Sequence, residues 1–155
     1  MVFAVIRLKG TVNLKKDVEV TLRSLRLNRR NHCIVLDASP GILGMINTVQ
    51  PYITWGEVDI KTLVALLAKR GKLAGNKRLT EDYLKQKTGN SIEQFAQDIL
   101  NKKIRMRDVP GLKPIFRLKP PSKGLEEKGM KKPYSLGGAY GYRGKDINEL
   151  LLRMI

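Results

Sequence analysis

The sequence has one cysteine and one histidine, Cys33 and His32, among its 155 residues. A single cysteine excludes an internal disulfide, and this pair is too small a set for a Cys/His zinc site. No run approaches about eighteen apolar residues, and the stretch MVFAVIRLKG has neither a leading basic region nor a small-residue cleavage site. We therefore expect a cytoplasmic protein with no metal, cofactor, leader or membrane span.

Acidic side chains are also scarce. Fourteen Asp and Glu stand against thirty Lys and Arg, which gives a formal net charge of +16. A chain so charged repels itself when compact and is usually found with a polyanion that neutralises it. Residues 102–145 alone carry 13 basic and 3 acidic side chains. Nucleic acid is therefore the first partner to consider.

Composition divides the chain into three regions. Residues 1–58 are apolar and well patterned, and we expect them to form an RNA-binding α/β core domain. Residues 59–101 have nearly balanced charge and predict a helical extension. Residues 102–155 are rich in Lys, Arg, Pro and Gly and predict a basic extended segment that ends in a helix.

The first region predicts three strands separated by two helices. FAVIRL is apolar on both faces, which is typical of a central strand, and HCIVL and ITWGEV are the other two candidates. Helices are predicted from about residue 14 to 27 and after Ser39-Pro40, where a serine N-cap precedes proline. This order favours a compact two-layer α/β sandwich. The pattern does not distinguish parallel from antiparallel pairing.

Helix starts are clearly marked in the rest of the chain. Asp59, Thr80 and Ser91 each precede an apolar stripe at N-cap positions, and a last helix begins near Asp146. The stripes predict core packing rather than chemistry.

The stretch TLRSLRLNRRNH, residues 21–32, has four arginines in eight positions. On the predicted helix, Arg23, Arg26 and Arg30 share one side. Further donors follow at Asn28, Arg29, Asn31 and His32. Because the planar guanidinium makes paired hydrogen bonds to phosphate, this side is a candidate RNA contact. The alternative is a solvated surface whose charge complements the helix dipole.

The tail segment RLKPPSKGLEEKGMKKPYSLGGAYGYRGK, residues 117–145, has many Pro and Gly and few aliphatic residues. We expect it to be mobile in isolation and to order on RNA. Its tyrosines alternate with cations, as in segments that stack on unpaired bases. The candidate contacts are Lys119, Lys123, Lys131, Lys132, Tyr134, Tyr140, Tyr142 and Arg143. The alternative is an exposed loop without function.

No catalytic constellation is evident. GGAYGYRGK has Ala139 and Asp146 where a P-loop needs glycine and Ser or Thr. His32 and Cys33 are adjacent strand residues that point to opposite faces, so they do not form a nucleophile and base pair. We predict no enzyme activity and no small-molecule substrate.

Four segments together resemble one known family. TLRSLRLNRRNH, SPGILGMINTVQPYITWGEV, LLAKRG and GGAYGYRGKDINELLLRMI are similar to the archaeal and eukaryotic form of large-subunit ribosomal protein L-thirty, the eukaryotic L-seven family. The resemblance spans nearly the whole chain. Residues up to about Val58 also resemble the shorter bacterial member.

The resemblance implies an α+β fold. It would have a ferredoxin-like three-stranded antiparallel sheet with two helices on one face, a mostly helical extension and a basic loop-rich tail. It implies a structural, non-catalytic role in the large ribosomal subunit, with ribosomal RNA and neighbouring ribosomal proteins as partners. The implied RNA contacts are Arg23, Arg26, Asn28, Arg29 and Arg30, and the segment around Pro40, Gly44 and Asn47. Small residues there permit close approach of a phosphate backbone, although Gly44 could equally serve packing.

Two other classes share part of the pattern. A DNA-binding chromatin or regulatory protein would have the same charge, but it usually shows a dimer seam, a recognition helix or a minor-groove arm. An enzyme acting on RNA would need an acid–base or metal constellation, and none is evident. We therefore expect a structural RNA-binding protein.

Overall fold

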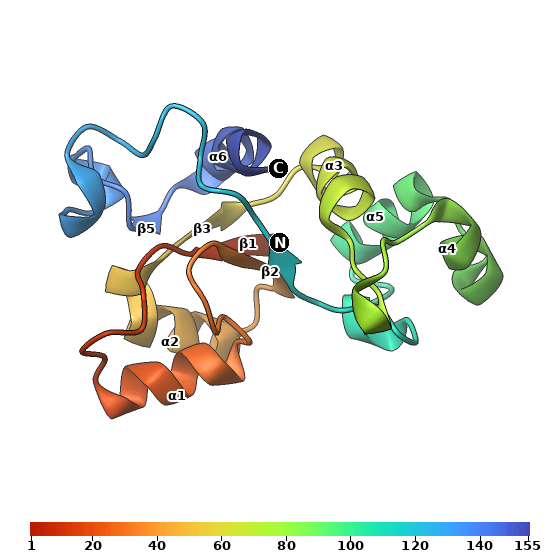
Figure 1. Cartoon of the computed structure of the whole chain (residues 1–155), viewed down its shortest axis with the longest axis horizontal. Coiled ribbons are helices and arrows are strands. Elements are labelled where there is room, and N and C mark those ends of the chain that lie inside the picture. Colours follow the sequence, from red (N-terminus) through yellow and green to blue (C-terminus); the bar gives the residue numbers. More distant parts are fainter.

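The computed structural model describes residues 1–155, arranged around one mixed, open sheet with strand order β4-β2-β1-β3-β5 (Figure 1). The strands are β1 (Val2–Arg7), β2 (His32–Asp37), β3 (Ile53–Glu57), β4 (Phe116–Arg117) and β5 (Gly141–Tyr142). The first three lie where the sequence predicts them. The two short strands come from the basic tail region and extend the sheet at both edges, so the expected count of three strands is incomplete.

Strand β1 is the centre of the sheet. It pairs antiparallel with β2 and β3, with Val5 opposite Ile34 on one side and Trp55 on the other. Strand β4 pairs antiparallel with β2, whereas β5 pairs parallel with β3. Every residue of β1 is buried, which confirms the central strand predicted from its two apolar faces. The α+β class is also confirmed.

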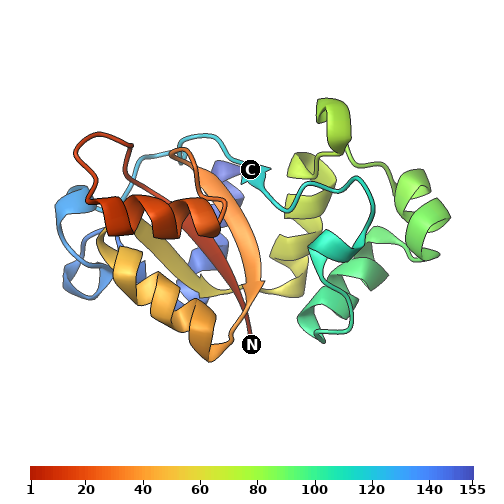
Figure 2. The ribbon, with the colours of Figure 1, turned by 90° about the horizontal axis from the view of Figure 1, so that it is seen from below.

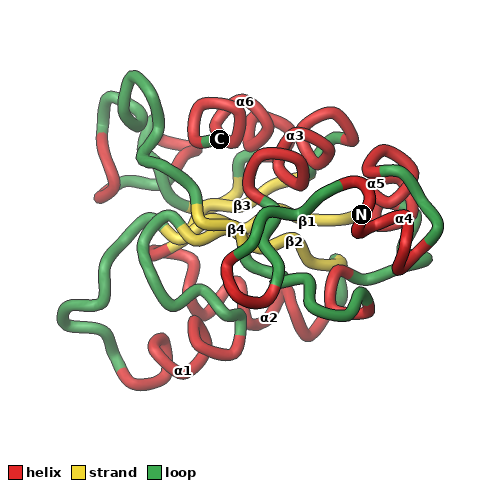
Figure 3. Tube along the Cα trace, turned by 45° about the vertical axis from the view of Figure 1, so that its right-hand side comes forward, coloured by secondary structure: helices red, strands yellow, loops and turns green.

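Helices cover both faces of the sheet. They are α1 (Lys16–Ser24), α2 (Pro40–Val49), α3 (Ile60–Arg70), α4 (Glu81–Thr88), α5 (Ile92–Leu100) and α6 (Ile147–Met154). Helices α1 and α2 lie side by side on one face of the sheet, in front of it in Figure 2, and α3 and α6 lie on the other face (Figure 3). The expected two-layer sandwich is therefore wrong for the whole chain, because β1 offers a second apolar face that α3 and α6 cover. None of the helices has the length and apolarity needed to cross a membrane.

The alternation of side chains along β1 divides the core into two clusters. Phe3 and Val5 pack with α1 and α2. Ala4 and Ile6 belong to a cluster of 23 buried residues that continues through α3, α5 and α6. The helical extension and the sheet therefore share one apolar core.

The predicted helix starts are present, with one difference. Thr80 accepts a hydrogen bond at the start of α4, and Ser91 with Gln94 forms a capping box on α5. Asp59 is at the N-cap of α3, but its side chain does not cap the helix. Its backbone N–H instead donates to Oδ1 of Asn148 at 2.9 Å, which ties α6 to the start of α3.

Helix α1 ends at Ser24, earlier than predicted. The N–H of Leu27 donates to the Leu22 carbonyl at 2.8 Å, and that of Arg26 donates to the Arg23 carbonyl at 2.9 Å. These are the two bonds of a Schellman motif, in which Arg26 occupies the left-handed position that glycine usually fills, at φ 59°. The buried Leu22 and Leu27 close the motif and offset the strain of about 1 kcal/mol in a non-glycine residue.

Gly56 on β3 lies under the turn that precedes α6. A Cβ at this position would overlap the Gly144 carbonyl oxygen and press on Ile147. We expect Gly56→Ala to lower the free energy of unfolding by about 2–3 kcal/mol, because the strand and the turn have to separate. Urea unfolding measures the change. Unchanged stability would show that the turn at Gly144 shifts freely.

Candidate nucleic-acid interface

Residues 25–31 connect α1 to β2, and we call them the arginine loop. Arg26, Arg29 and Arg30 are exposed, as is Asn28. Because α1 ends before the loop, only Arg23 remains on the helix. The predicted single helical face carrying Arg23, Arg26 and Arg30 is therefore wrong, and two of these three cations belong to the loop.

The arginines of the loop have no acidic partners. Arg23 pairs with Glu19 at 3.0 Å along α1, whereas no carboxylate lies within 4.0 Å of the three loop guanidinium groups. The one hydrogen bond that the Arg30 guanidinium makes is to the sulfur of Met130, at 3.9 Å. Exposed, unpaired guanidinium groups are available for two-pronged hydrogen bonding to phosphate. The interpretation as a surface that complements the helix dipole therefore applies to Arg23 alone.

Arg7 fixes the loop from its buried side, and this residue was not identified from the sequence. The buried guanidinium donates to the carbonyl oxygens of Leu27 at 2.6 Å, Lys9 at 2.8 Å and Gly10 at 2.8 Å. The Arg7 carbonyl in turn accepts from the N–H of Asn31 at 2.8 Å. Arg7 therefore holds both ends of the arginine loop, with its side chain at Leu27 and with its backbone carbonyl at Asn31. The only sequence signal was a cation at the end of an otherwise apolar strand.

His32 follows the loop at the start of β2, opposite Arg117 of β4. Burial lowers the pKa of His32, and the nearby charges of Arg117, Arg29 and Arg7 lower it further. The imidazole is therefore neutral near pH 7 and can stack on a base or accept a hydrogen bond. Arg117 is exposed and extends the cationic surface across the sheet edge.

Pro40, Gly44 and Asn47 lie at i, i+4 and i+7 on one exposed face of α2. A Cβ on Gly44 would meet nothing within 4 Å, so packing does not explain this glycine. Ser39 caps the helix by accepting from the N–H of Ile42 at 3.4 Å, and the first turn has no acidic residue. This face can therefore approach an anionic backbone closely.

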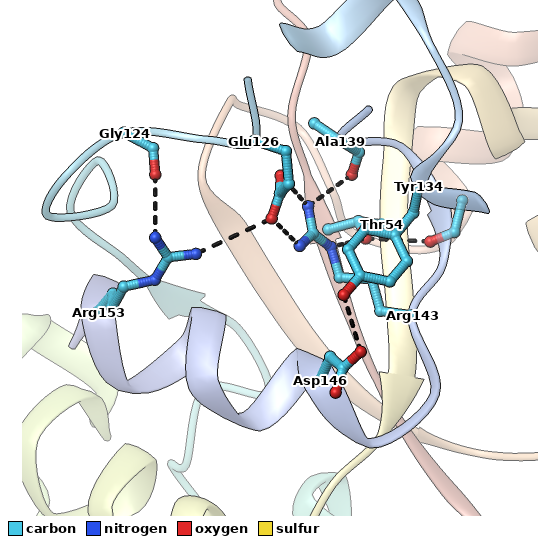
Figure 4. A network of polar contacts seen from close by, with 9 residues as sticks. Thr54, Gly124, Glu126, Tyr134, Ala139, Arg143, Asp146 and Arg153 are labelled. Carbon is cyan, nitrogen blue, oxygen red and sulfur yellow. Dashed lines mark hydrogen bonds and ion pairs between the residues drawn. The ribbon is translucent and has the colours of Figure 1, made fainter. Parts of the chain in front are cut away.

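The tail is ordered against the sheet, which differs from the mobile segment expected from its composition. Arg143 is buried and donates to both carboxylate oxygens of Glu126, to Oγ1 of Thr54 at 2.7 Å and to the Ala139 carbonyl at 2.8 Å (Figure 4). Thr54 belongs to β3, so this network fastens the tail to the sheet. The Arg143 guanidinium is consequently occupied inside the protein.

The three tail tyrosines also contact other side chains. The guanidinium carbon of Arg143 lies 4.5 Å from the ring centroid of Tyr134, and Nζ of Lys9 lies 5.2 Å from that of Tyr140. The ring centroids of Trp55 and Tyr142 are 4.7 Å apart. The Tyr134 hydroxyl donates to Asp146 at 2.7 Å, and this bond raises the pKa of Tyr134. Tyr142 remains 49% exposed and keeps a free surface.

Two contacts bring the tail beside the arginine loop. The N–H of Leu118 donates to the Asn31 carbonyl at 3.1 Å, and Met130 contacts Arg30. The tail lysines singled out in the sequence are all exposed: Lys119, Lys123, Lys131 and Lys132. Lys119 is next in sequence to Leu118, and Lys131 is next to Met130, so both lysines lie near the arginine loop. Lys123 instead follows Ser122, whose N–H donates to the Arg153 carbonyl on α6.

Comparisons with known proteins show which family this chain is similar to. Residues 3–53 match the family described as Ribosomal protein L30p/L7e. The chain is 48% identical over 149 residues to "Large ribosomal subunit protein uL30" of Methanopyrus kandleri, which covers 96% of this chain and 100% of that protein. It is 46% identical over 153 residues to the protein of the same name from Nanoarchaeum equitans, and the match covers 99% of this chain and 98% of that protein. The Methanococcus maripaludis protein is 46% identical over the full length of both chains.

Proposed function

Because the chain belongs to the ribosomal protein uL30 family and is a non-enzymatic constituent of the large ribosomal subunit, we propose that the arginine loop and the exposed face of α2 are its main contact with ribosomal RNA. The observation that carries the proposal is the set of exposed guanidinium groups on Arg26, Arg29 and Arg30, which have no carboxylate partners. Arg7 fixes their loop from within, so little order is lost on binding.

The proposed surface has three parts. The part on the loop and the adjoining strands comprises Arg26, Asn28, Arg29, Arg30, Asn31, His32 and Arg117. The part on α2 comprises Pro40, Gly44 and Asn47. The part on the tail comprises Lys119, Lys123, Lys131, Lys132, Tyr140 and Tyr142. Arg143 and Tyr134 are left out because they bind each other and nearby carboxylates. Arg23 contributes less because Glu19 partly neutralises it.

We assign the main RNA contact to residues 1–58 and a second, basic contact to residues 102–155, with residues 59–101 as the helical extension between them. Duplex DNA fits this surface less well. The exposed side of α1 carries Asp17 and Glu19, so it is no recognition helix for a polyanion. A large-subunit RNA transcript should therefore bind more tightly than duplex DNA of equal length at one salt concentration. Equal affinities would contradict this assignment.

Directed hydroxyl-radical probing tests where the RNA lies. Cys33 is fully buried and burial raises the pKa of its thiol, so a cysteine introduced by Asn28→Cys would be the only reactive one. An iron chelate attached there should cut the large-subunit RNA at a few clustered positions. The matched control is Lys87→Cys on α4, which should cut weakly. Stronger cutting from residue 87 than from residue 28 would contradict the proposal.

Gly44→Ala should separate RNA binding from stability. Alanine is favoured over glycine inside a helix, and the site has room for a Cβ, so we expect the free energy of unfolding to rise by about 0.5–1 kcal/mol. RNA affinity should fall, because the methyl group holds the phosphate backbone away from α2. Thermal unfolding and filter binding measure the two effects. Unchanged affinity would remove Gly44 from the RNA contact.

A further inference from the structure

A cavity of about 340 Å³ lies between the arginine loop and the helical extension. Its walls come from the end of α1, from β2, from the first half of α2 and from the segment 104–107. The interior is mainly apolar, with walls that include Ile34, Leu36, Ile42, Met45, Ile104 and Met106. The proposed RNA surface therefore borders an apolar recess, and Arg26 belongs to both.

The rim of the cavity is cationic. Arg26, Arg105 and Arg107 line it, and all three are exposed. Asp37 is the only acidic lining residue, and its carboxylate forms an ion pair with Nε of Arg105 at 3.9 Å, which is too long for a hydrogen bond. Arg26 and Arg107 have no carboxylate partner. An apolar recess with this rim suits a ligand that has a flat apolar body and flanking negative charges.

We propose that the cavity receives one unpaired nucleotide of the ribosomal RNA, an inference that rests on the proposed function. The base would enter between Ile42 of α2 and Ile104 of the segment 104–107. The flanking phosphates would meet the three arginines of the rim. The volume is within the usual range for small-ligand sites, about 300–1,000 Å³. The Asp37 carboxylate can accept from a 2′-hydroxyl or an exocyclic amino group.

The backbone at Arg26 supports this use. Arginine holds the left-handed position of the Schellman motif, where glycine would avoid a strain of about 1 kcal/mol. Strained residues of this kind cluster at functional sites. The motif also fixes where the Arg26 side chain leaves the backbone, beside the cavity. The alternative occupant is a side chain from a neighbouring protein, but the cationic rim favours an occupant that carries phosphate groups.

Two variants test the cavity with an in vitro transcript of the large-subunit RNA. Met45→Trp would fill the recess, and R105Q/R107Q would remove most of the charge on its rim. Both should weaken binding about tenfold. Both should also restore dimethyl sulfate reactivity at the same one or two unpaired bases that the wild-type protein protects. The rest of the footprint should remain.

Matched controls separate this effect from bulk and charge. Leu152→Trp adds a large side chain at an exposed position of α6, and K77Q/K87Q removes two exposed charges from the helical extension. Neither should alter the footprint. The variant R105Q/R107Q should fold normally, because both substituted side chains are exposed, so its effect on binding reports on the cavity rather than on misfolding.

The outcomes distinguish the alternatives. If both cavity variants protect every base that the wild type protects, the cavity holds no nucleotide and the inference is wrong. If they bind the transcript normally but fail to enter subunits reconstituted with all proteins, the occupant is a protein side chain and the inference is also wrong. Failure of the proposed function differs, because the iron chelate at residue 28 would then cut the RNA less strongly than the one at residue 87.

Discussion

Replacing Arg143 by methionine should lower the free energy of unfolding by about 3–5 kcal/mol, because removing one partner of a buried ion pair leaves the other charge desolvated. Glu126 would keep a half-buried carboxylate with only the longer ion pair to Arg153, at 3.9 Å, and Thr54 and Ala139 would lose a donor. Urea unfolding measures the loss. Amide exchange across residues 119–143 should also speed up, since this network fastens the tail to β3.

The double variant E126Q/R143M is the control. It removes both charges, so it should recover part of the lost stability. A single variant within about 0.5 kcal/mol of the wild type would show that the network does not hold the tail.

Acid provides a second test of the same network. Burial raises the pKa of Glu126, but the hydrogen bonds and charge of Arg143, together with a backbone hydrogen bond and the charge of Arg153, outweigh burial and leave that pKa below the ordinary 4.5. The resulting stabilisation is complete well above pH 4.5 and is lost as the pH falls through the folded-state pKa. The wild type should therefore lose stability below this pH more steeply than E126Q/R143M. Equal slopes would contradict the assignment.

The variant R26Q/R29Q/R30Q should weaken binding to large-subunit RNA by about 10²–10³-fold near 0.1 M salt. Each lost phosphate contact removes roughly 0.7–0.9 from the slope of log affinity against log salt, so the slope should fall by about 2–3. Stability should barely change, because the three side chains are exposed and unpaired. A salt titration with thermal unfolding on the same samples measures both effects.

The matched control for this variant is K61Q/K77Q/K87Q, which removes three exposed charges from the helical extension. It should lower the slope much less. An unchanged slope in the arginine variant, together with lower thermal stability, would mean that the loop serves the fold rather than the RNA.

Local sequence features predicted local structure well. The two apolar faces of FAVIRL indicated the central strand, and the Ser91–Gln94 pair indicated a capped helix. What local pattern could not predict was which segments meet across long separations. The pairing of Arg143 with Glu126, and the approach of Gly144 to Gly56, depend on the complete chain path. The order of the tail follows from these contacts, which its Pro- and Gly-rich composition does not reveal.

In the candidate site, too, local features were predicted from the sequence and long-range contacts were not. The concentration of arginines at residues 23–30 was visible directly, but the end of α1 was misplaced because the usual stop signal, glycine, is replaced by Arg26. Arg7 was missed because its partners are backbone carbonyls, which carry no sequence signal. Arg105 and Arg107 adjoin the loop only through the packing of the helical extension.

The two short edge strands have a consequence for the chain while it is being made. β4 covers part of the free edge of β2, and β5 covers part of that of β3. Uncovered strand edges are templates for pairing with other chains and lead to aggregation. Because β4 and β5 come from residues 116–142, the sheet has both edges open until most of the chain has been synthesised. The nascent protein is therefore open to pairing with other chains from the completion of β3 until these residues have been made, and the edge of β2 is covered before that of β3.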